Sequence, residues 1–423
     1  MNVLVIGSGG REHAFGWRIQ QSALSDKLFF APGNAGTTAL GTNLAVNPND
    51  FKAVKEAVLK NRIKLVVVGP EEPLVRGIVD FFGEDAELSG VTIIGPSKMG
   101  AALEGSKDFA KQFMLKHQIP TARYLTVTAH TSEEGKAFMK DLEAPYVLKA
   151  DGLAAGKGVV ILDDYKEACA ELDRMLGGKF GAAGNSVVIE EFLSGIELSV
   201  FVLTDGKDYF ILPEAKDYKR IGEGDKGLNT GGMGAVSPVP FADEAFMRKV
   251  EEKIIIPTVN GINKDQLAYK GFVFFGLIKV GDEPFVIEYN VRMGDPETEA
   301  VIPRLKNDFV ELLLATAQGN LKDHKAIIEK RTAVTLVLVS GGYPEQYKKG
   351  LPVRGVDKVD ASLVFHAGTA IQNSQMVTNG GRVFALTSFG NTIEEARAVS
   401  LKNAERIQFE GRNYRKDIGF DLI

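Results

Sequence analysis

The stretch FVIEYNVRMGDPETE, residues 285–299, decides the fold expected for this chain. Its first six residues alternate as a β-strand does, which places two sets of side chains on opposite faces: Phe285, Ile287 and Tyr289 on one, and Val286, Glu288 and Asn290 on the other. Because Glu288 and Asn290 are two residues apart, their side-chain oxygens project side by side from one face. Hard oxygen ligands without Cys or His nearby suit Mg²⁺, which then completes its coordination with water and nucleotide phosphates. The pattern predicts a metal–nucleotide site on this strand.

The alternative for an isolated Glu-x-Asn pattern is an edge strand whose polar side chains are simply solvated. In this chain the glutamate lies among Val, Ile and Tyr in a strand that reads as buried, where an unpaired carboxylate is costly. Arg292 follows on the same face, where it can clamp an anionic oxygen, and residues 294–297 then turn the chain sharply. The whole stretch therefore favours a metal–nucleotide site over a solvated strand.

Composition and charge are those of an ordinary soluble globular protein. The 423 residues predict about two to four domains, and the formal net charge of −5 gives no reason to expect nucleic acid or an anionic membrane as a partner. The only cysteine, Cys169, excludes internal disulfides and fits a reducing compartment; its helical surroundings predict a small buried residue rather than a nucleophile. The first residues read as a strand rather than a leader, and no apolar run reaches membrane-spanning length, so we expect a cytoplasmic protein.

Residues 1–102 alternate apolar strands with helical patterns, which predicts a parallel, doubly wound α/β sheet. The strands are expected at residues 2–6, 27–30, 63–68 and 91–94. In such sheets ligands collect at the carboxyl ends of the strands. Those ends carry four loops rich in Gly and Pro: residues 7–10, 32–34, 69–71 and 95–98.

The first of these loops invites a dinucleotide-binding interpretation, which the residues do not support. Gly7 and Gly9 fit the G-x-G-x-x-G fingerprint, but Glu12 stands at the third glycine, and no acidic residue follows the second strand. What remains is a glycine turn at a helix start, whose N–H groups attract a phosphate, with Arg11 and His13 adding positive charge. A tight turn without a ligand is the alternative.

The middle of the chain combines a helix at residues 107–117 with a glycine-rich loop. The strand at 146–149 leads into ADGLAAGKG, residues 150–158, and a return strand follows at 159–162. Such a loop is mobile and can fold its N–H groups over phosphates, while Lys149 on the strand supplies a fixed charge. The alternative is a plain glycine-rich hairpin. It is not a Walker loop, because the spacing differs and no helix follows.

Further strands are expected at residues 187–192, 199–203, 209–212 and 272–280. The segment 213–239 is long, glycine-rich and without periodicity, which predicts a functional loop without regular structure. From about residue 326 the chain changes to β-branched and aromatic strands, at 333–339, 364–367 and 383–387, followed by a helix at about 393–407. This pattern predicts a separate β-rich capping domain.

Five motifs in a fixed order carry a resemblance to a known family. They are GSGGREHA (7–14), KADGLAAGKGV (149–159), NTGGMGAVSP (229–238), RMGDPETE (292–299) and TNGGRV (378–383). Together with EEFLSGIE (190–197) and the E-x-N strand, they resemble the ATP-grasp superfamily of carboxylate–amine ligases. From end to end the chain is similar to the glycinamide ribonucleotide synthetase family within it.

The resemblance implies an organisation and a reaction. The implied domains are an N-terminal substrate domain at 1–102, an α+β ATP-grasp domain at 103–325 with a mobile lid at about 121–190, and a C-terminal domain at 326–423. The implied reaction joins glycine to 5-phosphoribosylamine with ATP and Mg²⁺ or Mn²⁺, giving glycinamide ribonucleotide, ADP and phosphate in purine biosynthesis. Small molecules are the implied partners, and a monomer is expected, with a weak homodimer as the alternative.

The resemblance also implies a role for individual residues. ATP would be bound by Lys107, Lys149, Gly152, Gly156, Lys157, Gly158, Glu190, Glu191, Phe192, Leu193 and Glu197. The metal would be held by Glu288 and Asn290, and the catalytic residues would be Lys149, Asp217, Arg292 and Asp295. The substrates would be bound by Gly9, Gly10, Arg11, Gly33, Asn34, Pro70, Glu71, Asn229, Thr230, Gly231, Gly232 and Arg292.

The chain departs from the family pattern at two places. Lys216 and Tyr218 stand where the family usually has Gln and His, and Lys279 lies in the strand that often supplies a further acid to the metal. Two alternatives stay open from the residues: another ATP-grasp ligase with a different acid or amine, and a non-catalytic ATP-binding regulatory protein. The NTGGMG loop at 229–234 and the stretch 292–299 argue against the first, and the full set of charged positions argues against the second.

Overall fold

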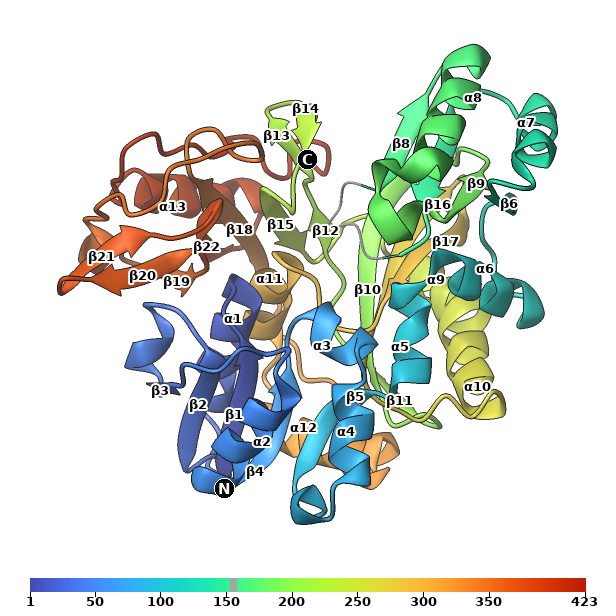
Figure 1. The fold of residues 1–423 in the computed structure, drawn as a ribbon. Helices are drawn as coiled ribbons and strands as arrows, with labels where there is room; N and C mark the ends of the chain where they lie inside the picture. The colour runs from blue at the N-terminus through green and yellow to red at the C-terminus, as the bar shows by residue number, and fades with distance from the viewer. Residues whose placement is uncertain (153–157) are drawn as a thin grey trace.

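The computed structural model describes residues 1–152 and 158–423 of the chain (Figure 1). Its N-terminal part is the predicted parallel sheet, with strands β1 (Asn2–Gly7), β2 (Lys27–Pro32), β3 (Thr42–Asn43), β4 (Ile63–Val68) and β5 (Thr92–Pro96) in the order β5-β4-β1-β2-β3. Alternate residues of β1 enter different cores: Leu4 and Ile6 pack with helix α2 (Phe51–Lys60), while Val3 and Val5 pack with helix α1 (Gly10–Ile19). Helices on both faces confirm the doubly wound α/β prediction.

The same sheet continues into an antiparallel part. Strand β16 (Tyr269–Val280) pairs with β5 at Tyr269–Pro96 and Lys270–Gly95. Beyond it follow β10 (Ile196–Thr204) and β11 (Tyr209–Ile211), and β17 (Glu283–Asn290) pairs with β16. The nine-stranded sheet therefore runs without a break between the part expected to bind substrate and the part expected to bind ATP, a continuity that the sequence did not predict.

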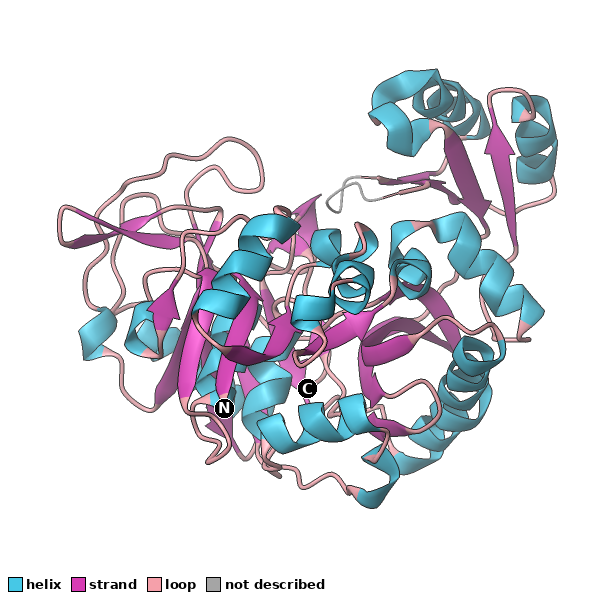
Figure 2. Ribbon diagram, turned by 60° about the horizontal axis from the view of Figure 1, so that its bottom comes forward, coloured by secondary structure: helices cyan, strands magenta, loops and turns pink. Residues whose placement is uncertain are grey.

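A second sheet stands apart from the main body, at the upper right of Figure 2. It has the order β6-β9-β7-β8, formed by β6 (Tyr124–Thr128), β7 (Tyr146–Ala150), β8 (Val159–Leu162) and β9 (Ser186–Glu190). Helices α7 (Ser132–Lys140) and α8 (Tyr165–Arg174) cover it and form a hydrophobic core of its own, against which the half-buried Cys169 packs. This unit coincides with the residues predicted to form a lid.

The third sheet belongs mainly to the C-terminal part, with the order β12-β15-β18-β22-β19. Strands β18 (Thr332–Val339), β19 (Ser362–His366) and β22 (Arg382–Gly390) and helix α13 (Ile393–Ala404) agree with the predicted elements. The prediction of a loop without regular structure at 213–239 is wrong. That segment contains β12 (Lys216–Asp217), β13 (Arg220–Gly222), β14 (Lys226–Asn229) and β15 (Gly234–Ser237). Strand β15 pairs with β18, about a hundred residues later in the chain, so its pairing leaves no local pattern.

Strand β17, which contains Glu288 and Asn290, also differs from its predicted alternation. Gly276 pairs with Glu288 and Leu277 pairs with Val286, so Ile287 is the extra residue of a β-bulge. The bulge turns Val286 to the same buried core as Tyr289, and the prediction that Val286 shares the face of Glu288 is therefore wrong. Beyond the bulge, Glu288 and Asn290 do project from one face.

The structure also contains further helices and a small hairpin. The helices are α3 (Glu71–Val75), α4 (Ile78–Glu84), α5 (Lys98–Gly105), α6 (Lys107–Lys116), α9 (Glu244–Val250), α10 (Ile256–Lys264), α11 (Glu297–Arg304) and α12 (Phe309–Gln318). A small hairpin is formed by β20 (Thr369–Gln372) and β21 (Gln375–Thr378). Within the described residues, no helix combines the length and the apolar character needed to cross a membrane.

Candidate active site

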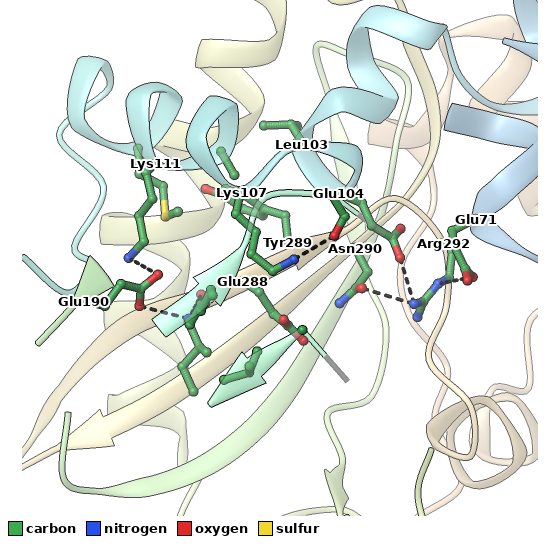
Figure 3. A pocket seen from close by; sticks show the side chains of 17 residues that line it. Glu71, Leu103, Glu104, Lys107, Lys111, Glu190, Glu288, Tyr289, Asn290 and Arg292 are labelled. Carbon is green, nitrogen blue, oxygen red and sulfur yellow. Dashed lines mark hydrogen bonds and ion pairs between the residues drawn. The ribbon is translucent and has the colours of Figure 1, made fainter. Parts of the chain in front are cut away.

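A cavity lies where the separate sheet faces β17 and helix α6 (Figure 3). Charged and polar side chains from distant parts of the chain line it: Glu71, Glu104, Lys107, Lys111, Lys149, Glu190, Glu288, Asn290 and Arg292. Gly152 and Gly158, at the ends of the glycine-rich loop, also line it, as do the apolar residues Leu103, Ala110, Met114, Val159, Ile287 and Tyr289. Seven of the predicted site residues with side chains thus meet in one place, together with Glu104 and Lys111, which the sequence reasoning missed.

A buried charge network forms one wall of this cavity. Glu190 on β9 accepts ion pairs from Lys149 on β7 at 2.9 Å and from Lys111 on α6 at 3.2 Å, and all three side chains are buried. Burial lowers the pKa of Lys111 to about 8, although Glu190 opposes the shift. One carboxylate thus fixes two ammonium groups at the cavity edge, which leaves a net positive charge suited to phosphate oxygens.

Lys107 lies at the first turn of α6, one turn before Lys111 on the same helix face. Its ammonium group donates to the carbonyl oxygen of Gly152 at 3.0 Å. The carboxylate of Asp151 accepts the backbone N–H of Lys107 at 2.6 Å and that of Asp108 at 3.2 Å. Asp151 therefore joins the start of the glycine-rich loop to the N-terminus of α6, where a negative charge is favoured.

Glu288 and Asn290 form the candidate metal site. Glu288 is exposed to the cavity, and among the described residues its carboxylate has no hydrogen-bond or ion-pair partner. The prediction that it lies in a buried position was wrong, because the bulge at Ile287 turns it outward. A free carboxylate beside an amide oxygen fits a divalent metal whose other ligands are water and phosphate. The described residues contain no group of three or more His, Cys, Asp or Glu side chains that could hold a metal ion.

Lys279 does not take part in this site. Its ammonium group donates to the carbonyl oxygen of Gly281 and the carboxylate of Asp282, at the far end of the β16–β17 pair. The residue that faces Glu288 across the pair is Gly276. The position that faces Glu288 therefore carries no side chain, and Lys279 adds no charge to this site.

Arg292 connects the strand that carries Glu288 and Asn290 to the N-terminal part of the molecule. Its Nη2 atom donates to Glu104 at 2.8 Å and to Asn290 Oδ1 at 3.1 Å, and its Nε lies 3.4 Å from Glu71 (Figure 3). Burial raises the pKa of Glu104, whereas Glu71 is kept ionised because Arg292 and Arg11 lower its pKa against the effect of burial. The guanidinium is thus held rigidly at the edge of the cavity.

A second cavity adjoins the N-terminal loops. Its lining includes Gly7, Ser8, Gly9, Arg11, Pro48, Asn49, Pro70 and Asp295. Pro70 lines the second cavity, and the next residue, Glu71, lines the first. Likewise, Arg292 lines the first cavity and Asp295 lines the second. The two cavities therefore lie on either side of Pro70–Glu71 and of the turn 292–295.

The side chain of Glu12 fills part of the glycine turn at the start of α1. The N–H of Gly9 donates to Glu12 at 2.5 Å, and Arg11 pairs with the same carboxylate at 2.6 Å and with the carbonyl oxygen of Met293 at 3.0 Å. Glu12, which replaces the third glycine of the dinucleotide fingerprint, thus occupies the inside of the turn. Gly10 packs against Glu299. The predicted binding of phosphate by the N–H of Gly9 is therefore not available in this structure.

Two other N-terminal residues serve the contact with the C-terminal part. Asn34 is buried, and its amide donates to the carbonyl oxygens of Ser8 and His366, while the neighbouring Gly33 has a positive φ of 73°. His13 accepts the N–H of His366 at 2.8 Å, and burial together with His366 lowers its pKa to about 3. The prediction that His13 adds positive charge to the loop is wrong, since the ring is neutral. Substrate binding by Gly33 and Asn34 stays a prediction.

Further residues predicted to bind ATP follow β9. Glu191 pairs through its side chain with Arg123 at 2.7 Å, and Phe192 is 43% exposed. Among the described residues, the carbonyl oxygen of Glu191 and the N–H of Leu193 have no hydrogen-bond partner. Glu197 is exposed and pairs with Lys219 at 2.7 Å. Gly156 and Lys157 lie outside the described residues.

Asp217, on β12, lies 3.7 Å from Lys219, and burial raises its pKa. The residues on either side of it point to the C-terminus of the chain. Lys216 and the hydroxyl of Tyr218 both bind the carboxylate of Asp421, at 2.6 and 2.7 Å. Lys216 and Tyr218, the two departures from the family pattern, therefore dock β12 on the C-terminal part.

The loop after β14 holds the remaining predicted substrate residues. Asn229 and Gly231 are exposed, the hydroxyl of Thr230 donates to the carbonyl oxygen of Lys219 at 2.8 Å, and Gly232 has a positive φ of 118°. Neither cavity described above includes this loop, so its role in substrate binding stays a prediction.

Lys111 and Glu104 could have been recognised only in part. Lys111 lies four residues after Lys107, so the helical spacing places both on one face. Glu104 gives no such signal, because its partner Arg292 is 188 residues away in the sequence.

Paired lysines around a buried glutamate and an E-x-N strand, beneath a separate four-stranded sheet, define an ATP-grasp enzyme, a class that binds ATP and a divalent metal ion. The phosphoribosylglycinamide synthetase N domain matches residues 1–104, the ATP-grasp (A) domain residues 105–298 and the C domain residues 333–421. The chain belongs to the phosphoribosylglycinamide synthetase family, a family of ligases, which confirms the resemblance stated above.

Individual relatives agree with this assignment. The phosphoribosylamine–glycine ligase of Caldanaerobacter subterraneus subsp. tengcongensis is 44% identical over 419 residues, which cover 99% of each chain. The crystal structure of phosphoribosylamine–glycine ligase from Thermotoga maritima has a TM-score of 0.86 at 38% identity, covering 99% of this chain and 100% of that one. The biotin carboxylase domain of the Hydrogenobacter thermophilus 2-oxoglutarate carboxylase shares the fold, with a TM-score of 0.71 at 17% identity, covering 97% and 91%.

Proposed function

We propose that this protein joins glycine to 5-phosphoribosylamine at the expense of ATP, through glycyl phosphate, as the names of its relatives suggest. The observation that carries the proposal is that residues close together in the chain line both cavities: Glu71 and Arg292 line the first, and Pro70 and Asp295 line the second. One cavity has the charges needed to activate a carboxylate with ATP, and the other opens on the N-terminal loops.

In the first cavity the chain supplies positive charge and a hydrogen-bonding edge. Lys107 and Lys149 are placed to hold phosphate oxygens, and Glu190 keeps Lys149 in position. Directly after Glu190, the carbonyl oxygen of Glu191 and the N–H of Leu193, which have no hydrogen-bond partner among the described residues, suit the edge of adenine. The apolar residues of the cavity suit its ring. Glu288 and Asn290 would hold Mg²⁺ or Mn²⁺, which, when bound, neutralises phosphate charge.

The carboxylate of glycine must lose its negative charge before an amine can attack it. We assign this carboxylate to Arg292, whose guanidinium is held between Glu104 and Glu71. A carboxylate oxygen then attacks the γ-phosphorus of ATP; an O–P bond forms and the bond to ADP breaks. A lid closed over the cavity would protect the resulting acyl phosphate from water.

The amine of phosphoribosylamine attacks the carbonyl carbon from the side of the second cavity. A C–N bond forms, the C–O bond to phosphate breaks, and the nitrogen loses a proton. Three carboxylates line this cavity: Glu12, which already accepts the N–H of Gly9 and pairs with Arg11, and also Glu72 and Asp295. We assign the proton to Asp295, whose Oδ2 atom is turned toward Gly9. Arg11 adds positive charge where the sugar phosphate would lie.

The proposal includes three further statements: that the three parts of the chain act as domains with the bounds 1–102, 103–325 and 326–423, that the protein acts as a monomer, and that it is cytoplasmic. The separate core of the lid sheet supports the idea that residues 121–190 move as a unit.

A labelled-oxygen experiment tests the reaction. Glycine carrying ¹⁸O in its carboxylate is incubated with the protein, ATP, Mg²⁺ and phosphoribosylamine, and the products are analysed by mass spectrometry. One ¹⁸O atom is expected in inorganic phosphate for each product molecule. Label in AMP, or ADP release that does not depend on glycine, would contradict the acyl-phosphate route. Nucleotide binding without any turnover would instead support a regulatory protein.

A further inference from the structure

The C-terminal motif TNGGRV, residues 378–383, has no role in the site described so far. Its arginine, Arg382, begins strand β22 and extends away from the C-terminal sheet. Its Nη1 atom donates to the carbonyl oxygens of Gly231 at 2.5 Å and of Asp295 at 2.6 Å. Its Nη2 atom pairs with Asp295 Oδ1 at 3.0 Å. One guanidinium thus joins three parts of the chain.

Tyr343, also from the C-terminal part, completes the contact. Its hydroxyl accepts the N–H of Gly231 at 2.9 Å, while Arg382 donates to the carbonyl oxygen of the same residue. Gly381 lies against the ring of Tyr343, where a side chain would collide with it. The peptide groups on both sides of Gly231 are therefore held by the C-terminal part.

Among the described residues, the contact leaves one carboxylate oxygen of Asp295 without a hydrogen-bond partner. Arg382 binds Oδ1 and the backbone carbonyl of Asp295, whereas Oδ2 is turned toward Gly9, 3.1 Å from the position that a methyl group on Gly9 would take. Gly232 packs on Pro296, which directly follows Asp295, so the turn and the loop move together. The orientation of Asp295 toward the second cavity thus depends on Arg382.

We propose that Arg382 is a positioning residue that acts through Asp295 and the Gly231 loop to set the geometry of amine attack. The inference rests on the proposed function, because that function gives Asp295 its task. It makes the C-terminal part a component of the second half-reaction rather than a passive cover. ATP binding does not depend on it, since none of the residues that line the first cavity contacts Arg382.

The test is a double-mutant cycle of Arg382→Met and Asp295→Asn, with Arg331→Met as the matched control. Arg331 lies in the same part of the chain, pairs with Glu329 and stacks on Phe389, away from both cavities. Arg382→Met should lower kcat about 100-fold, as expected for a misplaced catalytic group. The KM for ATP should change less than about twofold, since uniform binding is unaffected. In the Asp295→Asn protein, Arg382→Met should cause little further loss.

A further measurement, chemical rescue, separates positioning from structural support. Guanidinium chloride at low concentration should restore part of the activity of Arg382→Met and none of that of Asp295→Asn. If Arg382→Met does not fold, Arg382→Lys, which keeps the charge but not both donor atoms, takes its place in the cycle. The proposal would be overturned if the losses of activity caused by Arg382→Met and Asp295→Asn add independently in the double variant. It would also be overturned if Arg382→Met changed the KM of ATP as much as the KM of both other substrates.

The wild-type protein in the same assay keeps the two proposals apart. If it does not require glycine and phosphoribosylamine for ADP release, the proposed function fails, whatever the variants do. If it requires both, an unchanged kcat in Arg382→Met overturns the role of Arg382 alone.

Discussion

Gly276 lies directly opposite Glu288 in the β16–β17 pair, and a methyl group on Gly276 would come within 3.1 Å of Glu288 Cγ. The missing side chain is what lets the glutamate extend into the cavity. The position that faces Glu288 therefore has no side chain, and the carboxylate extends past it.

Replacing Gly276 by alanine should therefore displace Glu288. We expect turnover to fall about tenfold, because small displacements of a charged group weaken transition-state stabilisation strongly. The activity should also need more Mg²⁺ to saturate. Steady-state rates over a range of Mg²⁺ concentrations measure both. Gly83→Ala, which has no neighbouring atom within 4 Å of the new methyl group, is the control. An unchanged Mg²⁺ dependence would show that Glu288 tolerates the contact.

Glu288→Gln should abolish most turnover while the fold stays intact. The charge lost is the one expected to anchor the metal, and losses of roughly 10²–10³-fold are usual when such a group is removed. The thermal unfolding midpoint should not fall, because Glu288 is exposed and forms no ion pair with the described residues. Asp282→Asn, on the exposed turn beyond the strand, is the control. Near-normal rates at ordinary Mg²⁺ would remove Glu288 from the site.

Lys149→Ala should weaken the use of ATP more than that of glycine. Its ammonium group is fixed by Glu190, and a charge directed at phosphate contributes on the order of 2–4 kcal/mol to the transition state. Initial rates with each substrate varied in turn give the comparison. Loss of glycine dependence with normal ATP dependence would mean that β7 faces the other substrate.

The sequence predicted those residues of the site whose positions follow from local sequence patterns. Glu288 and Asn290 are two residues apart, and any extended backbone places them together. The parallel strands of the N-terminal part are continuous apolar runs between helices, a pattern with one common solution. Lys149 lies at the end of the short apolar run 146–148, in the separate four-stranded sheet, so its place beside the glycine-rich loop was predictable too.

What the sequence could not supply depends on partners far along the chain. The bulge at Ile287 is set by pairing with β16, and Val286 is buried because of it. Strand β15 has four residues and no alternation, and it exists because β18 pairs with it. Arg382 reaches Asp295 across 87 residues of sequence. Such contacts are decided by the packing of finished elements, which no local pattern records.

Glu297 gives a prediction for pH. It is buried, and burial together with Asp217 raises its pKa from 4.5 to about 7; Lys219 and Arg292 act in the opposite direction. Between about pH 4.5 and 7 the folded state therefore keeps a proton that the unfolded state has lost. The free energy of unfolding should fall as pH rises through this range and level off above it, by an amount on the order of 1–3 kcal/mol for this group.

Glu297→Gln should remove that contribution. Urea unfolding at several pH values between 4.5 and 7.5 gives the slope, which should be less negative in the variant than in the wild type, whereas the exposed Glu134→Gln should keep the wild-type slope. Equal slopes in wild type and Glu297→Gln would show that Glu297 ionises in the folded protein as it does in the unfolded chain.

The hydrogen bonds between β5 and β16 have a consequence for the timing of each catalytic cycle. The carboxyl ends of the parallel strands and the strand that carries Glu288 and Asn290 belong to one continuous sheet, so they cannot separate as two hinged domains can. The distance over which the amine must reach the activated carboxylate is therefore fixed when the chain folds. The sheet β6-β9-β7-β8, with its own core, is free of that constraint. Nucleotide exchange can then proceed by motion on one side of the molecule, while the amine side keeps its alignment from one turnover to the next.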